Sequence, residues 1–168
     1  MSRRDQIRMS DAEVLEFLEY ERTVTCATNG PRGWPHLMPL WYVVRPAGDA
    51  GAPAPEVWAW TYAASQKTRN LERDPRATLQ VEAGATYDQL RGVMLEADTT
   101  IHRDAALVGS FGRELFARYG ADQGAPPLGE LAPGVGEMID AQAPKRVVLQ
   151  FVPTRSATWD HRKLAGRY

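Results

Sequence analysis

The chain has 168 residues, of which 43% are hydrophobic and 24% are charged, and its formal net charge is −1. These values fit one globular domain with a full core, and we expect residues 1–168 to form a single domain. The near-neutral balance argues against a general nucleic-acid surface, and a single cysteine excludes a disulfide within the chain and a cysteine metal cluster.

The chain contains no apolar run near the roughly 20 residues that span a bilayer. Its first residues are basic, but no apolar segment follows them, so no secretory signal is expected. With one cysteine as well, the sequence is typical of a cytoplasmic protein.

The first predicted element is a helix over residues 11–20. Ser10 and Glu13 match a capping box, in which each side chain bonds the other residue's backbone amide. Val14, Phe17 and Leu18 then fall at the spacing of one helical face. We therefore expect an amphipathic helix that packs on a core.

Three strands are predicted next, over residues 23–28, 36–44 and 56–62, because these runs are rich in β-branched and aromatic residues. Pro39 lies inside the second run and cannot donate to a ladder. An edge position, a bulge or a ligand-facing break is expected there. Residues 45–55 are rich in Pro, Gly and Ala and predict a loop.

The remaining elements continue this pattern of short strands and a few helices. They are a helix over 65–73 that stops before Asp74-Pro75, strands over 77–82 and 92–101, a helix over 104–119 ended by Gly120, a loop over 121–143 with room for a short helix, and a strand over 145–153. Short strands without regular alternation with long helices predict a mainly β (α+β) fold: a small barrel with flanking helices.

Four basic side chains stand close together after the third strand: Lys67, Arg69, Arg73 and Arg76. Three interpretations fit them: a solvated helix face, a nucleic-acid contact, or a pocket for an anionic cofactor. The helix start before Lys67 would add free amides and a positive dipole end, which favours an anion.

Histidine and cysteine spacing gives no catalytic or metal signature. His36, His102 and His161 lack metal-ligand spacing, and we expect each to be a hydrogen-bonding residue. Cys26 is expected to be a small core residue. Neither a nucleophile triad nor a paired-carboxylate motif is visible, so the catalytic residues stay unassigned and no metal site is predicted.

Two stretches, TVTCATNGPRGWPHLMPLWYVV and VWAWTYAASQKTRNLERDPRATLQVE, carry a family resemblance. Together they resemble the pyridoxamine-5′-phosphate-oxidase-like split β-barrel superfamily. The similarity is closest to its flavin/deazaflavin oxidoreductases of group B, which are reductases dependent on coenzyme F420. This resemblance implies a six-stranded split β-barrel with flanking helices, and a homodimer with cofactor sites at the subunit interface.

The resemblance also assigns the basic stretch. Ser65, Gln66 and Lys67 match positions that bind the cofactor phosphate in the family, and Arg69 and Asn70 follow as supporting residues. In this interpretation the basic stretch is a phosphate clamp. The two later arginines of the stretch are expected on the surface.

The ring of the cofactor is assigned to the proline-containing strand. Met38, Pro39 and Leu40 match the strand that passes the flavin or deazaflavin ring, and Trp41 is a neighbour of the ring or of the partner subunit. Residues 25–28 match the adjacent strand. This assignment explains the proline inside the strand, because Pro39 would bring the strand backbone against the cofactor ring.

The activity implied is hydride transfer between reduced coenzyme F420 and a small conjugated electrophilic substrate, with the cofactor supplying the chemistry. An FMN-dependent oxidoreductase is the alternative. Pyridoxamine-phosphate oxidation itself is not expected, because TWDHRKLAGRY lacks the family's RLH-like run. A non-catalytic flavin or haem binder, with His36 as axial ligand, and a nucleic-acid binder using residues 67–76 are the other classes left open.

Overall fold

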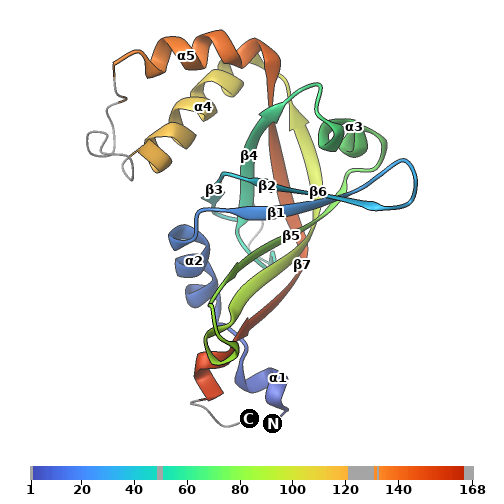
Figure 1. Cartoon of the computed structure of the whole chain (residues 1–168), viewed down its shortest axis with the longest axis vertical. Helices are drawn as coiled ribbons and strands as arrows, with labels where there is room; N and C mark the ends of the chain where they lie inside the picture. Colours follow the sequence, from blue (N-terminus) through green and yellow to red (C-terminus); the bar gives the residue numbers. More distant parts are fainter. Residues whose placement is uncertain (1, 49–50, 121–130, 132, 165–168) are drawn as a thin grey trace.

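The computed structural model describes residues 2–48, 51–120, 131 and 133–164. Its centre is one antiparallel sheet of seven strands in the order β2-β1-β5-β6-β7-β4-β3 (Figure 1). The strands are β1 (Val24–Asn29), β2 (Pro35–Leu40), β3 (Tyr42–Arg45), β4 (Glu56–Tyr62), β5 (Arg76–Ala83), β6 (Arg91–His102) and β7 (Arg146–Asp160).

Five α-helices and three short 3-10 helices flank the sheet in the described residues. They are α1 (Arg3–Gln6), α2 (Asp11–Tyr20), α3 (Gln66–Arg73), α4 (Ala105–Gly120), α5 (Val135–Gln142), η1 (Tyr87–Gln89), η3 (Ala143–Lys145) and η4 (His161–Leu164). Over this part of the chain no helix is long and apolar enough to cross a membrane.

The sheet curls far enough for β2 to contact β4, although the two strands are not neighbours in the sheet order. Figure 1 shows the β1–β2 ribbon crossing the long strands β4, β6 and β7. This closure gives the predicted split barrel with flanking helices. It also brings residues from β1, β2 and β4 around one end of the barrel, beside α3.

The predicted strand over residues 36–44 is two strands, so the sheet has seven strands and not six. Trp41 separates β2 from β3, and these strands form the two opposite edges of the sheet. Tyr119 on α4 fixes the break: its ring stacks on Trp41 at 4.4 Å, and its hydroxyl accepts from the Tyr42 amide at 2.9 Å. A tertiary contact thus overrides the local strand pattern.

Two apolar cores lie on the two faces of the sheet. Inside the barrel, alternating residues of the strands pack with Phe17 and Leu18 of α2. On the outer face, α4 and α5 cover Trp58 and Trp60. Gly112 permits this close packing, since a Cβ there would lie 2.9 Å from a methyl carbon of Ile139.

The other predicted elements agree with the structure in position and differ at their ends. The helices over 11–20 and 65–73 are α2 and α3, and the Ser10–Glu13 capping box is present. Gly120 is the last residue of α4, and β7 runs to Asp160. The predicted loop over 121–143 contains α5, while its residues 121–130 and 132 lie outside the described part.

Candidate functional site

The basic stretch folds into α3, a helix with two different faces. Ser65 begins it, and its hydroxyl accepts from the Thr68 amide at 3.4 Å. Lys67, Thr68 and Asn70 are buried against the barrel, whereas Arg69 is exposed. The buried face of α3, which carries Lys67, is therefore the face that could bind a ligand within the fold.

Lys67 directs its ammonium group into the end of the barrel. The residue is 7% exposed, and its Nζ donates to Thr61 Oγ1 at 2.8 Å. Burial lowers the pKa of Lys67, because the charged form loses solvation, while the nearby Cys26 has a smaller, opposite effect. Burial also raises the pKa of the Cys26 thiol to about 12, so Cys26 stays neutral and cannot balance this charge.

No carboxylate in the described part of the chain pairs with Lys67. Eight ion pairs are present there, and none of them includes this ammonium group. Burying a cation without a counter-ion costs free energy, and a ligand anion would offset that cost. The arrangement is therefore suited to an anionic ligand such as a phosphate.

Asn70 holds α3 against the barrel. It is fully buried, and its Nδ2 donates to Thr28 Oγ1 of β1 at 3.0 Å. Its Oδ1 accepts from Gln66 Nε2 at 2.8 Å and from Arg73 Nη2 at 3.3 Å. With its amide fully engaged, Asn70 positions the helix and would support a ligand site only indirectly.

The remaining basic residues of the stretch lie on the surface. Arg73 donates to the carbonyl of Asn29 at 2.5 Å, and Arg76 forms an ion pair with Asp74 at 2.8 Å. Hydrogen bonds from Arg76 and then from Asn29 hold the pKa of Asp74 well below its usual range. The expectation that Arg73 and Arg76 are surface residues is confirmed. Arg69 is also exposed, outside the buried group around Lys67.

The predicted ring strand is the edge strand β2. Pro39 therefore occupies one of the positions expected for it, at an edge where a missing N–H breaks no ladder. Leu40 is buried in the core, whereas Met38 is 40% and Trp41 is 42% exposed. Trp41 is not in the strand and instead packs on Tyr119 of α4. Met38 thus offers accessible apolar surface on the strand that contacts α3, whereas the exposed surface of Trp41 lies beside α4.

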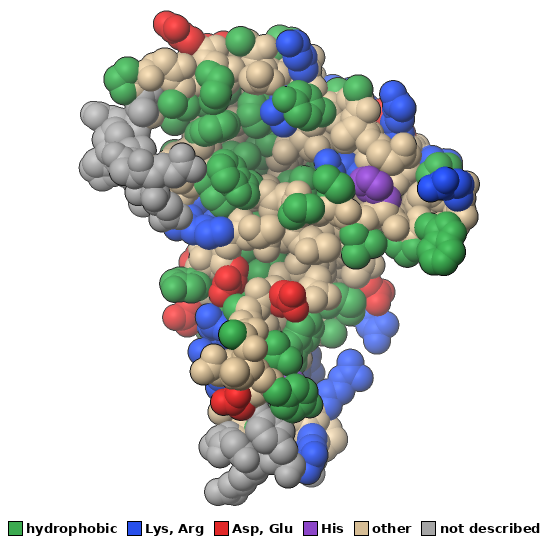
Figure 2. Space-filling model, viewed as in Figure 1, with side chains coloured by type: hydrophobic (Ala, Val, Ile, Leu, Met, Phe, Trp, Pro, Cys, Tyr) green, Lys and Arg blue, Asp and Glu red, His purple; other side chains and the backbone are tan. Residues whose placement is uncertain are grey.

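Several large apolar side chains are exposed around this edge. They are Trp34, Leu37, Met38 and Trp41. Figure 2 shows hydrophobic side chains gathered over α4, α5 and the region of β2, whereas acidic side chains gather lower on the same face. A flat aromatic ligand would find apolar surface and little negative charge in the upper region.

The fold brings the two halves of the predicted site together, because β2 contacts both α3 and β4. Thr61 was missed by sequence reasoning, although it is the hydrogen-bond partner of Lys67. The sequence contained a signal for this contact, because alternation along β4 puts Thr61 on the buried face with Val57 and Ala59. A polar residue at such a position is a candidate for a buried polar contact.

The three histidines have different surroundings. His102 exchanges a hydrogen bond with Gln150 at 2.8 Å, and His161 with the carbonyl of Tyr87 at 3.0 Å. His36 pairs with Thr28 across β1 and β2, and its Nδ1 is buried without a hydrogen-bond partner. The described residues contain no cluster of histidine, cysteine and acidic side chains that could hold a metal ion.

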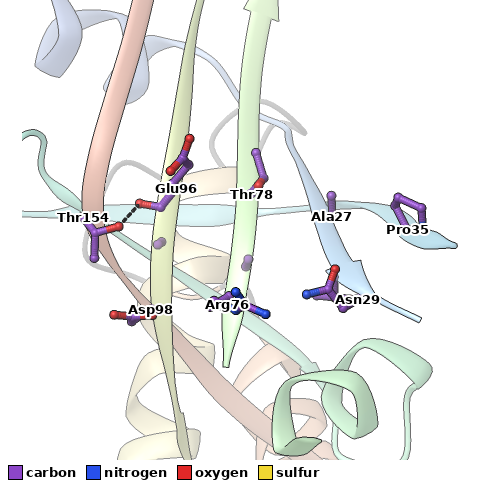
Figure 3. Close-up of a pocket in the computed structure, with 11 residues that line it drawn as sticks. Ala27, Asn29, Pro35, Arg76, Thr78, Glu96, Asp98 and Thr154 are labelled. Carbon is purple, nitrogen blue, oxygen red and sulfur yellow. Dashed lines mark hydrogen bonds between the residues drawn. The ribbon is translucent and has the colours of Figure 1, made fainter. Parts of the chain in front are cut away.

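A polar groove of about 510 Å³ lies on the outer face of the sheet (Figure 3). The side chains drawn there come from β1, β2, β5, β6 and β7 and include Arg76, Thr78, Glu96, Asp98 and Thr154. None of the predicted cofactor residues lines it. The groove and the buried group around Lys67 are therefore separate features of the molecule.

The chain is similar to known proteins over its whole length. The sequence profile of the pyridoxamine 5′-phosphate oxidase family matches residues 10–160. A conserved hypothetical protein from Mycobacterium tuberculosis is 38% identical, with a TM-score of 0.79, and the similarity covers 100% of this chain and 95% of that chain. No curated protein matches the chain in sequence.

More distant solved structures share the fold alone. An F420 reductase is 22% identical with a TM-score of 0.59, covering 84% of this chain and 94% of that chain. A haem storage protein from Vibrio cholerae is 15% identical with a TM-score of 0.60, covering 89% of this chain and 93% of that chain. Proteins of this fold thus include both a reductase and a haem protein.

Proposed function

The chain belongs to the pyridoxamine 5′-phosphate oxidase family, and we propose that it is an oxidoreductase that binds a phosphate-bearing flavin-type cofactor. We propose coenzyme F420 as that cofactor, with FMN as the alternative. The substrate class is a small conjugated electrophile. When bound, the cofactor supplies the hydride chemistry, and the protein supplies binding and orientation.

One observation carries this proposal: the buried ammonium group of Lys67, which has no carboxylate partner among the described residues. A phosphate at Lys67 would neutralise the charge, and Thr61 Oγ1 lies 2.8 Å from the same ammonium. The first amides of α3, at Gln66 and Lys67, are free of intrahelical partners and could donate to the same anion. The residues present therefore fit the phosphate of either cofactor.

The β2 edge would hold the ring. Met38 supplies exposed apolar surface on β2, the strand that contacts α3, and the exposed Trp41 follows this strand. Apolar surface beside the ring would exclude water from the reacting face and orient the substrate. No side chain in this group is an evident proton donor, which agrees with chemistry carried by the cofactor.

We also propose that the protein is a homodimer whose subunit interface completes the cofactor site. The support is the open position of the β2 edge, where Leu37 is 57% and Met38 is 40% exposed and the following Trp41 is 42% exposed. A partner that covered them would bury apolar surface and enclose the ring. Sedimentation of the purified chain as a monomer would contradict this assembly.

The test is a fluorescence titration of the purified protein with F420 and, separately, with FMN. Lys67→Met removes the charge and keeps the length of the side chain, so we expect both affinities to fall by about tenfold or more. Lys163→Met, at a lysine of η4 that pairs with Glu13, is the charge-matched control and should bind as the wild type does. If neither cofactor binds the wild type, or Lys67→Met binds equally well, the proposal fails.

A second candidate, a non-catalytic haem-binding barrel, is favoured by the unpartnered Nδ1 of His36. A ring nitrogen without a hydrogen bond is free to ligate iron. This candidate predicts a haem absorbance band on titration that is lost in His36→Ala. His161→Ala is the matched control, since that histidine already bonds a backbone carbonyl. A band that is absent, or unchanged in His36→Ala, would remove this function.

A further inference from the structure

Arg146 is a half-buried arginine that lies against two aromatic rings. It is the first residue of β7, directly across from Tyr62 at the end of β4. Its guanidinium carbon lies 3.6 Å from the centre of the Tyr62 ring and 4.7 Å from that of Trp60. Its Nε is buried without a hydrogen-bond partner. Two aromatic rings therefore hold the guanidinium in place while its donors are unused.

No described carboxylate pairs with Arg146, in contrast to the arginines that do form ion pairs. Those residues are Arg45, Arg76, Arg91, Arg103, Arg113, Arg155 and Arg162. Lys67, which also forms no ion pair with a described carboxylate, interacts unfavourably with Arg146, and this contributes to the lowered pKa of Lys67 after the larger effect of burial. Partly buried cations without a counter-ion destabilise a fold unless a ligand supplies negative charge.

The two cations lie on opposite faces of β4. Thr61, which accepts from Lys67, points into the barrel, whereas Tyr62, on which Arg146 stacks, is 48% exposed on the other face. One small anion would reach only one of them. A ligand with two anionic groups joined by a linker could engage Lys67 with one group and the fork of Arg146 with the other.

We infer that Arg146, stacked on Tyr62, forms a second anion subsite that binds an anionic group of the cofactor other than the phosphate held by Lys67. This inference rests on the proposed function and deepens it. Coenzyme F420 carries a negatively charged tail in addition to its phosphate, whereas FMN carries the phosphate alone. The subsite would therefore select F420 over FMN.

The experiment compares F420 and FMN affinities in the wild type and in Arg146→Gln, by fluorescence titration. We expect F420 affinity to fall by about tenfold, which is the effect of one charge-assisted contact, and FMN affinity to change by less than about twofold. Arg146→Lys keeps the charge but loses the planar fork, so it should recover only part of the F420 affinity. Arg155→Gln, an exposed arginine farther along β7, is the control and should bind both cofactors normally.

Each other outcome has a definite meaning. Equal losses for both cofactors would put Arg146 at the phosphate and overturn the inference, as would no loss for either, while the proposed function would stand in both cases. If neither cofactor binds the wild type, the proposed function fails. Thermal unfolding in inorganic phosphate against chloride at equal ionic strength then decides the inference, because an anion subsite at Arg146 should make phosphate stabilise the wild type more than Arg146→Gln.

Discussion

At the scale of the residue, Lys163 and Lys67 show how different the surroundings of two lysines in one chain can be. Lys163 lies near the surface and donates to Glu13 and to the carbonyl of Arg8, both at 2.7 Å. Lys67 is buried with a hydroxyl as its only described partner. The contact of Lys163 with Glu13 stabilises the fold slightly. Burial of the Lys67 ammonium group lowers the stability of the fold, and a bound anion would offset this loss.

The stability lost on burying the charged Lys67 leads to a prediction about how unfolding depends on pH. The pKa of Lys67 in the folded chain lies below its ordinary value of 10.5, so the unfolded chain holds the proton more tightly. The resulting loss of stability is fully present at neutral pH and disappears as pH rises toward 10.5, where both states release the proton. We expect the stability difference between Lys67→Met and the wild type to move in favour of the wild type as pH rises. Urea unfolding at several pH values measures it, and a constant difference would contradict the assignment.

At the scale of the element, α3 is held by polar contacts more than by apolar ones. Leu71 is its buried apolar anchor, while Asn70 bonds Thr28 across to β1 and Thr68 bonds the carbonyl of Tyr62 at 3.0 Å. Directional bonds fix the position of a helix more tightly than one apolar contact. The position of Lys67, one turn before Leu71, is therefore determined by this polar set.

The prediction at this scale concerns Asn70→Ala. The change leaves the buried Thr28 hydroxyl without its donor and removes the acceptor of Gln66, so we expect a loss of about 2 kcal/mol in the free energy of unfolding. Arg69→Ala, on the exposed face of the same helix, should change stability by less than about 0.5 kcal/mol. Urea denaturation of both variants measures the contrast, and equal stabilities would show that α3 is held in another way.

At the scale of the whole molecule, the sheet separates a barrel core from an outer core under α4 and α5. The strand β4 belongs to both, since Val57 faces the barrel and Trp60 faces the helices. The proposed cofactor residues gather at one end of this shared strand. A change that loosens the outer core would therefore also disturb Thr61 and Arg146, on either side of the β4 end.

The sequence predicted most elements because their signals are local, such as the capping box at Ser10 and the proline after α3. The assignment of Lys67 to the cofactor phosphate came from a family motif and stays a prediction. The sequence did not predict the division at Trp41, which depends on a ring of α4. Nor did it predict Arg146, whose contact with Tyr62 arises from the pairing of β4 with β7, strands far apart in the chain. Such contacts depend on sheet register, which no local pattern contains.

The two edges of the sheet also restrict how this protein can aggregate. β2 carries Pro35 and Pro39, which have no N–H to offer an incoming strand, and β3 is four residues long and is followed by Pro46. Uncovered edges ordinarily recruit strands from other chains and lead to fibrils. Both edges here are poor templates, so the exposed apolar side chains beside β2 can meet another molecule through their faces without the backbone polymerising.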